Sequence, residues 1–192
     1  IKVVVHMKRI IFATGNQHKL EEIRAILPTF DIISAKEAGI SLDIEETGTT
    51  FKENAYIKAK AIWDITGGIV LSDDSGLEVD YIGGEPGVYS SRYMGEDTSY
   101  TIKNQNIIDR LANAKGEERS ARFIACVCAI LEDGTALFTE GSMDGLISTK
   151  AAGKNGFGYD PILYLPDYGK TSAEISMDEK NKISHRGKAL RQ

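Results

Sequence analysis

The sequence predicts an α/β fold built around a mixed β-sheet. Apolar stretches of strand length alternate along the chain with apolar residues at helical spacing. Two Ser/Thr-x-x-Glu patterns, beginning at Thr50 and Ser176, are typical of helix starts. Because helices and strands intermix throughout, a sheet with both parallel and antiparallel neighbours is favoured.

The first half of the chain begins with a strand predicted at 8–13. A helix follows in which apolar residues recur every three or four positions as far as Pro28. A second helix is expected from Thr50 to the Gly67-Gly68 pair. An apolar strand at 69–72 then leads into a polar turn, and Leu77 and Val79 indicate a further short strand.

The second half opens with a glycine-containing loop at 83–95 and a helix near 97–113. A hairpin is expected from strands 121–131 and 135–140, joined at Asp133-Gly134, with another strand near 144–149. A glycine-rich loop at 152–160 precedes the helix that Ser176 begins. That helix is expected to run toward His185-Arg186, and a last helix to stop early.

Composition bounds the function. The chain has 192 residues, 42% of them hydrophobic and 27% charged, which suits one globular domain over 8–192. A net charge of -5 argues against a broad nucleic-acid-binding surface, and no apolar run is long enough to cross a membrane. Residues 1–7 are too short for a signal peptide, and we expect them to have been added in cloning. The alternative is a native extension of the first strand.

The two cysteines indicate the redox compartment. Cys126 and Cys128 are two residues apart in an apolar strand, so they share one face. This spacing is neither a zinc pair nor a redox motif, and we expect free, buried thiols in a reducing cytoplasm.

Two polar segments of the N-terminal half carry candidate chemistry. Thr14-Gly15-Asn16-Gln17-His18-Lys19 joins a strand to a helix, where backbone N–H groups and a lysine suit a phosphate. Asp73-Asp74 follows an apolar strand, and paired acids there favour cation binding or acid–base work, although a polar turn is the simpler alternative. Glu45-Glu46 stands just before a helix. An acid here can share a metal ion with Asp74, or it can simply interact favourably with the helix dipole.

Two segments of the C-terminal half suggest recognition of a base. Gly156-Phe157-Gly158-Tyr159-Asp160 offers exposed backbone, two aromatic faces and a carboxylate that can accept from a base edge. Lys180 and Ser184-His185-Arg186 supply donors for phosphate or carbonyl oxygens. The alternatives are a loop whose aromatics fill the core and an ordinary basic helix end.

Together these segments resemble the nucleoside-triphosphate pyrophosphatases of the Ham1/RdgB type, which clear inosine and xanthosine triphosphates. The resemblance runs in order from about residue 8 to the C-terminus and is closest to the bacterial members. The matching stretches are Thr14-Gly15-Asn16-x-x-Lys19, Glu45-Glu46-Thr47-Gly48, Phe51-x-Glu53-Asn54-Ala55, Asp73-Asp74-Ser75-Gly76-Leu77, Gly83-Gly84-x-Pro86-Gly87-x-Tyr89-Ser90-x-Arg92-Tyr93, Gly156-Phe157-Gly158-Tyr159-Asp160-Pro161 and Lys180-x-x-Ile183-Ser184-His185-Arg186.

The resemblance implies an elongated, two-lobed fold of the Maf/Ham1 type around a long mixed sheet, and a homodimer. It implies magnesium-dependent hydrolysis of ITP, dITP and XTP to the monophosphate and pyrophosphate. Asp74, or its neighbour Asp73, would act as the base, and Asp74 with Glu45 would hold magnesium. The substrate would bind residues 14–19 (Thr14, Gly15, Asn16, Gln17, His18 and Lys19), Ser75, Phe157, Gly158, Tyr159, Asp160, Lys180, His185 and Arg186.

Three other functions stay open at this point. A nucleotide-binding sensor would use the same turns without hydrolysis, although the paired acids disfavour it. A single-stranded RNA-binding module would use Phe157 and Tyr159 as stacking platforms, although the acidic net charge disfavours it. A pyrophosphatase for a different damaged nucleotide is the remaining enzyme. We expect a free purine nucleotide as partner, and neither nucleic acid nor a membrane.

Overall fold

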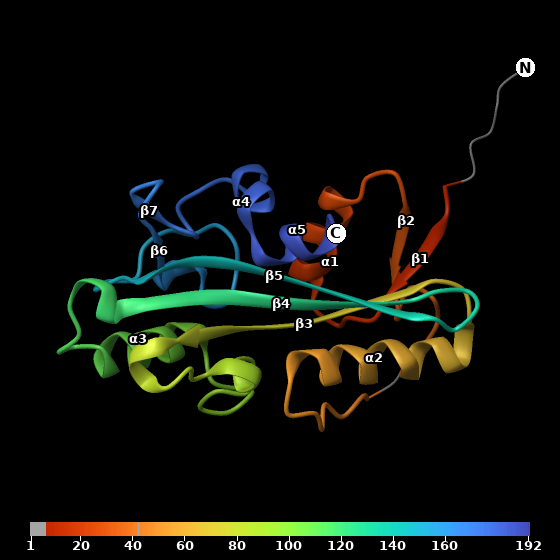
Figure 1. The fold of residues 1–192 in the computed structure, drawn as a ribbon, viewed down its shortest axis with the longest axis horizontal. Helices are drawn as coiled ribbons and strands as arrows, with labels where there is room; N and C mark the ends of the chain where they lie inside the picture. The colour runs from red at the N-terminus through yellow and green to blue at the C-terminus, as the bar shows by residue number, and fades with distance from the viewer. Residues whose placement is uncertain (1–6, 42) are drawn as a thin grey trace, which may run out of the picture. The chain divides into compact units, whose positions relative to one another are not determined.

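The computed structural model describes residues 7–41 and 43–192, and the expectation for residues 1–7 therefore lies, apart from Met7, outside the described residues. The chain divides into two compact units, one of residues 1–74 and 126–139 and the other of 75–125 and 140–192. The described strands form one sheet in the order β2-β1-β3-β4-β5-β6-β7 (Figure 1). Strand β1 is parallel to β2 and β3, whereas β6 is antiparallel to β5 and β7, so the predicted mixed sheet is confirmed.

The strands are β1 (Arg9–Phe12), β2 (Asp31–Ser34), β3 (Val70–Val79), β4 (Ser120–Ile130), β5 (Ala136–Ile147), β6 (Leu163–Leu165) and β7 (Lys170–Thr171). The α-helices are α1 (Gln17–Ile26), α2 (Phe51–Thr66), α3 (Tyr100–Arg110), α4 (Met177–Ile183) and α5 (His185–Leu190). None of the helices that the structure describes is long and apolar enough to span a membrane.

In the first unit, helices α1 and α2 lie on opposite faces of the sheet (Figure 1). Helix α2 begins as predicted, because Thr50 Oγ1 accepts from the Glu53 N–H at 3.1 Å. Its buried face carries Ala55, Ala59 and Ile62, and the small alanines let the helix approach β3 closely. In this unit, β3 therefore has α1 on one face of the sheet and α2 on the other.

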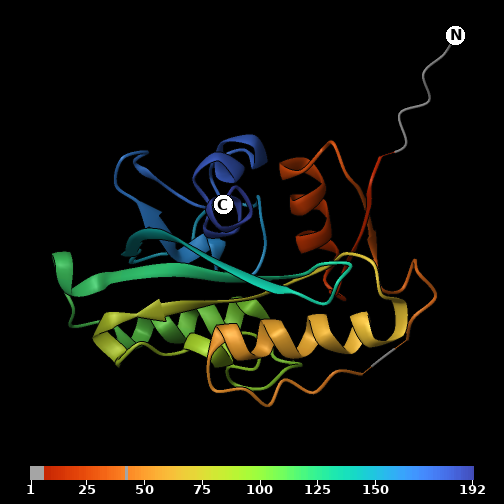
Figure 2. The same cartoon turned by 45° about the vertical axis from the view of Figure 1, so that its right-hand side comes forward.

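In the second unit, α3 covers one face of the strands and α4 with α5 covers the other (Figure 2). Its hydrophobic core contains residues of both chain segments that form the unit. Leu77 and Val79 of β3 pack there among residues of α3, β4 and β5. Ser176 Oγ accepts from the Glu179 N–H at 3.1 Å, which confirms the predicted start of α4. The hairpin turn, which belongs to the first unit, is also confirmed, since the Leu131 N–H donates to the Thr135 carbonyl at 2.9 Å.

Strand β3 corrects the sequence interpretation most clearly. Residues 73–76 are not a turn, because β3 continues without interruption from Val70 to Val79. Successive residues of a strand face opposite sides, and each acid meets a lysine from a different helix. Asp73 pairs with Lys19 of α1, and Asp74 lies near Lys58 of α2. These cations allow two carboxylates to be buried in mid-strand.

Other differences concern boundaries. Strand β5 continues to Ile147, so the separate strand expected near 144–149 is part of it. The expected C-terminal helix is divided at Ser184, which ends α4 and caps α5. Strands β2, β6 and β7 were not predicted, because their two to four residues are too short to show a periodicity. Cys126 and Cys128 are buried thiols that form no disulfide within the described residues, as expected.

Candidate active site

The turn before α1 is held by its own side chains. Thr14 Oγ1 accepts from the Asn16 N–H at 3.0 Å, and Asn16 Oδ1 caps the helix by accepting from the His18 and Lys19 N–H groups at 3.0 and 3.3 Å. Asn16 therefore occupies donors that the sequence had assigned to a phosphate. Within the described residues, the N–H groups of Gly15 and Gln17 donate to no protein acceptor. These two exposed donors are the ones that an anion can use.

Gly15 is not required by the protein itself. Its φ lies outside the left-handed region, and an added Cβ would meet no heavy atom within 4 Å. A side chain here would project into open space at the turn that carries the exposed N–H groups. The glycine thus keeps the turn open to an external group.

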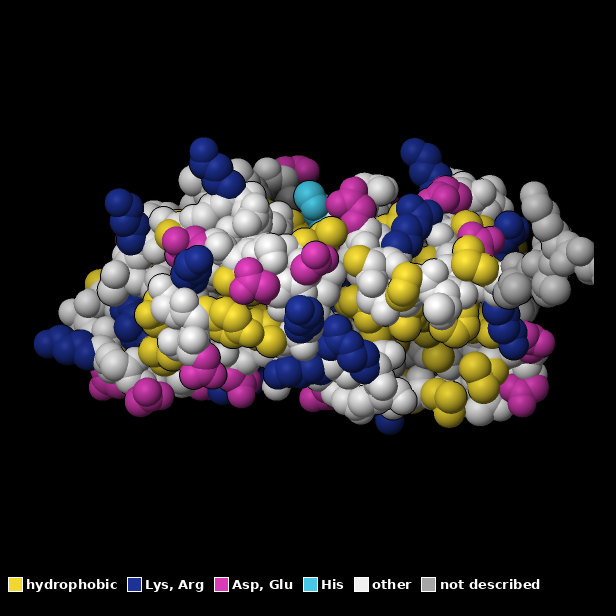
Figure 3. Space-filling view, turned by 90° about the horizontal axis from the view of Figure 1, so that it is seen from above, with side chains coloured by type: hydrophobic (Ala, Val, Ile, Leu, Met, Phe, Trp, Pro, Cys, Tyr) yellow, Lys and Arg dark blue, Asp and Glu magenta, His cyan; other side chains and the backbone are white. Residues whose placement is uncertain are grey.

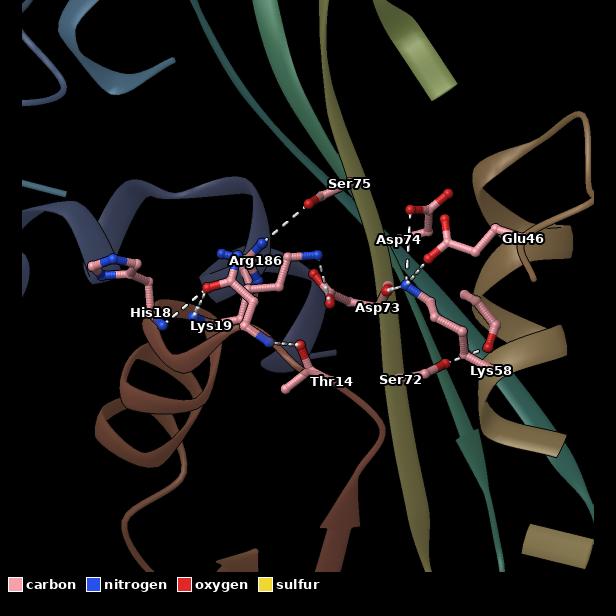
Figure 4. Close-up of polar contacts among 12 residues, drawn as sticks. Thr14, His18, Lys19, Glu46, Lys58, Ser72, Asp73, Asp74, Ser75 and Arg186 are labelled. Atoms are coloured by element: carbon pink, nitrogen blue, oxygen red, sulfur yellow. Dashed lines mark hydrogen bonds and ion pairs between the residues drawn. The ribbon is translucent and has the colours of Figure 1, made fainter. Parts of the chain in front are cut away.

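Lys19 is half-buried at the end of this turn. Its Nζ lies 3.2 Å from Asp73 Oδ1, and the Asp73 side chain is buried (Figure 4). A lysine paired with a buried carboxylate remains charged and keeps a fixed position. Asp73 therefore holds Lys19 at the turn of residues 14–19.

Asp74 is a buried carboxylate with a strongly shifted pKa. Burial raises its pKa from an ordinary 3.8 to about 6, with Glu46 and Asp73 adding to the rise while Lys58 and Lys19 oppose it. The residue is 6% exposed, and within the described chain no hydrogen-bond partner reaches its Oδ2. A carboxylate with this pKa and an unused oxygen is suited to accept a proton near neutral pH.

Lys58 and Glu46 complete this group; the sequence named Glu46 only as part of the Glu45-Glu46 pair and did not assign Lys58 to the site. Lys58 Nζ donates to the Asp73 carbonyl at 2.5 Å and lies 3.2 Å from Glu46 Oε1 and 3.9 Å from Asp74 Oδ1 (Figure 4). Glu45, which the sequence favoured as metal ligand, is exposed, whereas Glu46 is half-buried beside Lys58. The four-residue spacing of Asn54 and Lys58 was the available signal, but it equally fits a solvated helix face.

This group fits a magnesium ion. Magnesium is usually held by one or two carboxylates together with substrate phosphates. Asp74 supplies one such carboxylate, and Glu46 contributes a second to the same group. Within residues 7–41 and 43–192, no three His, Cys, Asp or Glu side chains converge as an all-protein metal cage. The residues therefore suit a cation that is shared with a phosphate.

The second unit holds the candidate base-recognition residues, organised by Asp160. Asp160 Oδ2 accepts from the Phe157 N–H and from Lys180 Nζ, both at 2.8 Å. Its Oδ1 accepts from Ser172 Oγ at 2.7 Å. With three donors already bound, this carboxylate is arranged to shape the loop and fix Lys180 rather than to contact a base. Direct contact of Asp160 with a base edge stays a prediction.

Two cationic groups lie near the ring of Phe157. Lys180 Nζ is 4.9 Å and Arg186 Cζ 5.9 Å from the centre of its half-buried ring. The Arg186 guanidinium, itself 1% exposed, also donates to Ser75 Oγ at 3.1 Å. An aromatic face beside two fixed cationic donors is an arrangement that can stack on a base and donate to its carbonyl oxygens.

Tyr159 and His185 pack inside the second unit. Tyr159 donates its hydroxyl to the Ser90 carbonyl at 2.5 Å and meets Tyr100 edge to face. His185 stacks on Phe123, with ring centres 5.0 Å apart. Gly158 has a φ of +62°, and its carbonyl accepts from Asn104 Nδ2 at 3.1 Å, so α3 supports the loop. Our substrate-binding assignments for Tyr159 and His185 stay predictions, but their side chains have packing roles.

Taken separately, the two units define the class of protein. The first contains a buried acid–base carboxylate with lysines and a helix-start turn, which suits phosphate chemistry. The second contains a stacking face with carbonyl-directed donors, which suits a base. These are the parts of a nucleotide-processing α/β protein.

The chain belongs to the Ham1 family, which it matches over residues 10–192. It is 47% identical over 192 residues to a protein of Clostridium perfringens named dITP/XTP pyrophosphatase, covering 96% of this chain and 94% of that one. A protein of the same name from Escherichia coli O157:H7 is 45% identical over 190 residues, covering 96% and 95%. Among solved structures, a HAM1 protein from Coxiella burnetii superposes with a TM-score of 0.86 at 42% identity, covering 97% of this chain and 96% of that one. The Ham1 protein of Staphylococcus aureus gives 0.85 at 38% identity, covering 96% and 95%.

Proposed function

We propose that this protein hydrolyses the 6-keto purine nucleoside triphosphates ITP, dITP and XTP to the monophosphate and pyrophosphate, and so cleanses the nucleotide pool. Membership of the Ham1 family and the names of its relatives support this activity. The structural observation that carries it is Asp74, a buried carboxylate with one unpartnered oxygen and a pKa of about 6.

In the proposed reaction a water molecule attacks the α-phosphorus. The bond between the water oxygen and the α-phosphorus forms, the bond from this phosphorus to the bridging oxygen breaks, and pyrophosphate leaves with that oxygen. Asp74 takes the proton of the water through its free Oδ2. Its pKa leaves it mostly ionised at neutral pH and above, where a base is needed.

The other residues of this site in the first unit bind the phosphates and balance their negative charge. The N–H groups of Gly15 and Gln17 bind phosphate oxygens, and Lys19 adds a positive charge that Asp73 holds in place. Magnesium, held by Asp74 with Glu45 or Glu46, would neutralise phosphate oxygens when bound. Comparing Glu45→Gln with Glu46→Gln in a metal titration of activity distinguishes the two ligands.

Selectivity would arise in the second unit. Phe157 stacks on the purine, and Lys180 and Arg186 donate to keto oxygens. An amino group in place of the keto group offers only further donors, so these two side chains would face a donor where ITP presents an acceptor. Asp160 acts as a positioning residue, because its three hydrogen bonds hold the Phe157 backbone and Lys180.

Three further properties belong to the proposal. The protein acts as a homodimer, which light scattering after gel filtration tests. It acts in the cytoplasm, where free thiols such as Cys126 and Cys128 persist. It acts on free nucleotides rather than nucleic acid, because its net charge is -5 and basic side chains are interspersed with acidic ones on the face seen in Figure 3.

Pyrophosphate release from a panel of nucleotides with magnesium tests the function. The expected result is turnover of ITP, dITP and XTP that exceeds turnover of ATP by at least tenfold in kcat/KM, as about 1.4 kcal/mol of discrimination gives. Tight binding of ITP without release would instead indicate a nucleotide sensor. Turnover confined to another modified nucleotide would indicate a pyrophosphatase for that base.

A further inference from the structure

Lys58 stands out as a half-buried cation among oxygen atoms. Its side chain is 13% exposed, although lysine is seldom buried unless it is paired. The three nearest acceptors are the Asp73 carbonyl, Glu46 Oε1 and Asp74 Oδ1. An ammonium group has three donors and no acceptor, so this oxygen-rich surrounding satisfies it.

These acceptors are also the atoms that a divalent cation prefers. Carboxylate and carbonyl oxygens are the usual protein ligands of magnesium and manganese. Two positive charges held by one pair of carboxylates repel each other, and burial strengthens that repulsion. A metal that binds Asp74 or Glu46 therefore has to displace the Lys58 ammonium or tolerate its charge.

We propose that Lys58 is an internal counter-cation that keeps this carboxylate pair from binding a divalent metal until a nucleotide arrives. The phosphates of the nucleotide bring the negative charge that lets metal and ammonium coexist. The metal then enters as the metal–nucleotide complex instead of being resident in the free protein. This inference rests on the proposed function only for the identity of the incoming anion.

Helix α2 supplies a matched control. Lys60, two residues further along, has a 42% exposed side chain and pairs with Asp64 on the helix surface. Removing its charge changes the net charge of the protein by the same amount as removing that of Lys58. Only the position of the lost charge differs between the two variants.

The experiment measures Mn²⁺ binding without nucleotide, by the loss of the electron-spin-resonance signal of the free ion. Lys58→Met should bind Mn²⁺ at least tenfold more tightly than wild type, whereas Lys60→Met and the charge-conserving Lys58→Arg should bind as wild type does. Lys58→Gln, which keeps a donor for the Asp73 carbonyl, provides a second neutral variant if Lys58→Met does not fold. Circular dichroism in EDTA identifies the folded variants.

Equal Mn²⁺ affinity in the neutral Lys58 variants and Lys60→Met would overturn the inference, as would weaker binding by the neutral variants. Either result would make Lys58 a structural tether or a direct helper of metal binding. Because the assay contains no nucleotide and measures no turnover, its failure leaves the hydrolysis assay unaffected. A failure of hydrolysis likewise leaves the Mn²⁺ affinities intact.

Discussion

Replacing Asp74 by asparagine should stabilise the metal-free protein while destroying its activity. Burial raises the pKa of Asp74 from 3.8 to about 6. Between these pH values the folded protein keeps a proton that the unfolded chain has lost, so the free energy of unfolding falls as the pH rises. Below about pH 4 both states are protonated and the wild type carries no penalty; above about pH 6 it carries the full penalty.

The size of the effect follows from the pKa difference. Each unit of pKa corresponds to about 1.4 kcal/mol, so the gap between 3.8 and about 6 amounts to about 3 kcal/mol. Asparagine resembles the protonated acid, but its amide would face the Lys58 ammonium, which offsets part of the gain. We therefore expect Asp74→Asn to be more stable by about 1–3 kcal/mol at pH 8, or about 3–9 °C in Tm for a chain of this size.

The assay is thermal unfolding in EDTA from about pH 4 to 8, with wild type and variant side by side. The gain should be near zero at the acid end and grow through the pH range that separates the two pKa values. In a separate assay with magnesium, pyrophosphate release by the variant should be about a hundredfold or more below that of wild type, as loss of a general base predicts.

The neighbouring Asp73→Asn is the control, because it removes the ion pair with Lys19 and should lower stability. The reasoning would be refuted if Asp74→Asn were no more stable than wild type at pH 8, or if its gain did not change with pH. Near-normal kcat in Asp74→Asn would remove Asp74 from the role of base.

The remaining predictions concern the phosphate turn, the base and the metal. Gly15→Ala should keep or slightly raise Tm, since its Cβ meets nothing within 4 Å, yet raise the KM for ITP about tenfold; a lower Tm with unchanged KM would contradict the open turn. Lys19→Ala should raise KM and also lower Tm, because it leaves buried Asp73 without this cation, and a change in Tm alone would make Lys19 structural. Arg186→Ala should lower kcat/KM for ITP by the equivalent of about 1.5–3 kcal/mol and for ATP much less, whereas equal losses would place Arg186 on the phosphates. EDTA should abolish pyrophosphate release and added magnesium restore it, and full activity in EDTA would exclude the metal.

Sequence reasoning identified the parts of the molecule that depend on local pattern. The helix starts at Thr50 and Ser176 and the hairpin turn after Leu131 follow from neighbouring residues, and the structure contains all three. The family resemblance likewise depends on motifs that are contiguous in the chain. Contiguous signals therefore gave the mixed α/β fold and the family.

The errors concern contacts between residues far apart in the sequence. The acids at 73–74 read as a turn because the lysines that neutralise them, Lys19 and Lys58, come from other helices. For the same reason the sequence did not show that Glu46 is the glutamate that pairs with Lys58. The sequence also gave no sign that Ser172, twelve residues away in the chain, donates to Asp160, whose contact with a base edge stays a prediction. The contacts that form in the folded protein decide which hydrogen-bond donors and acceptors of these residues stay available to a ligand.

Turnover of ITP in water enriched in oxygen-18 tests the central claim most directly. If water attacks the α-phosphorus with Asp74 as base, mass spectrometry will find one heavy oxygen in the inosine monophosphate and none in the pyrophosphate. Heavy oxygen in pyrophosphate, or release of inorganic phosphate in its place, would mean attack at another phosphorus and would contradict the mechanism.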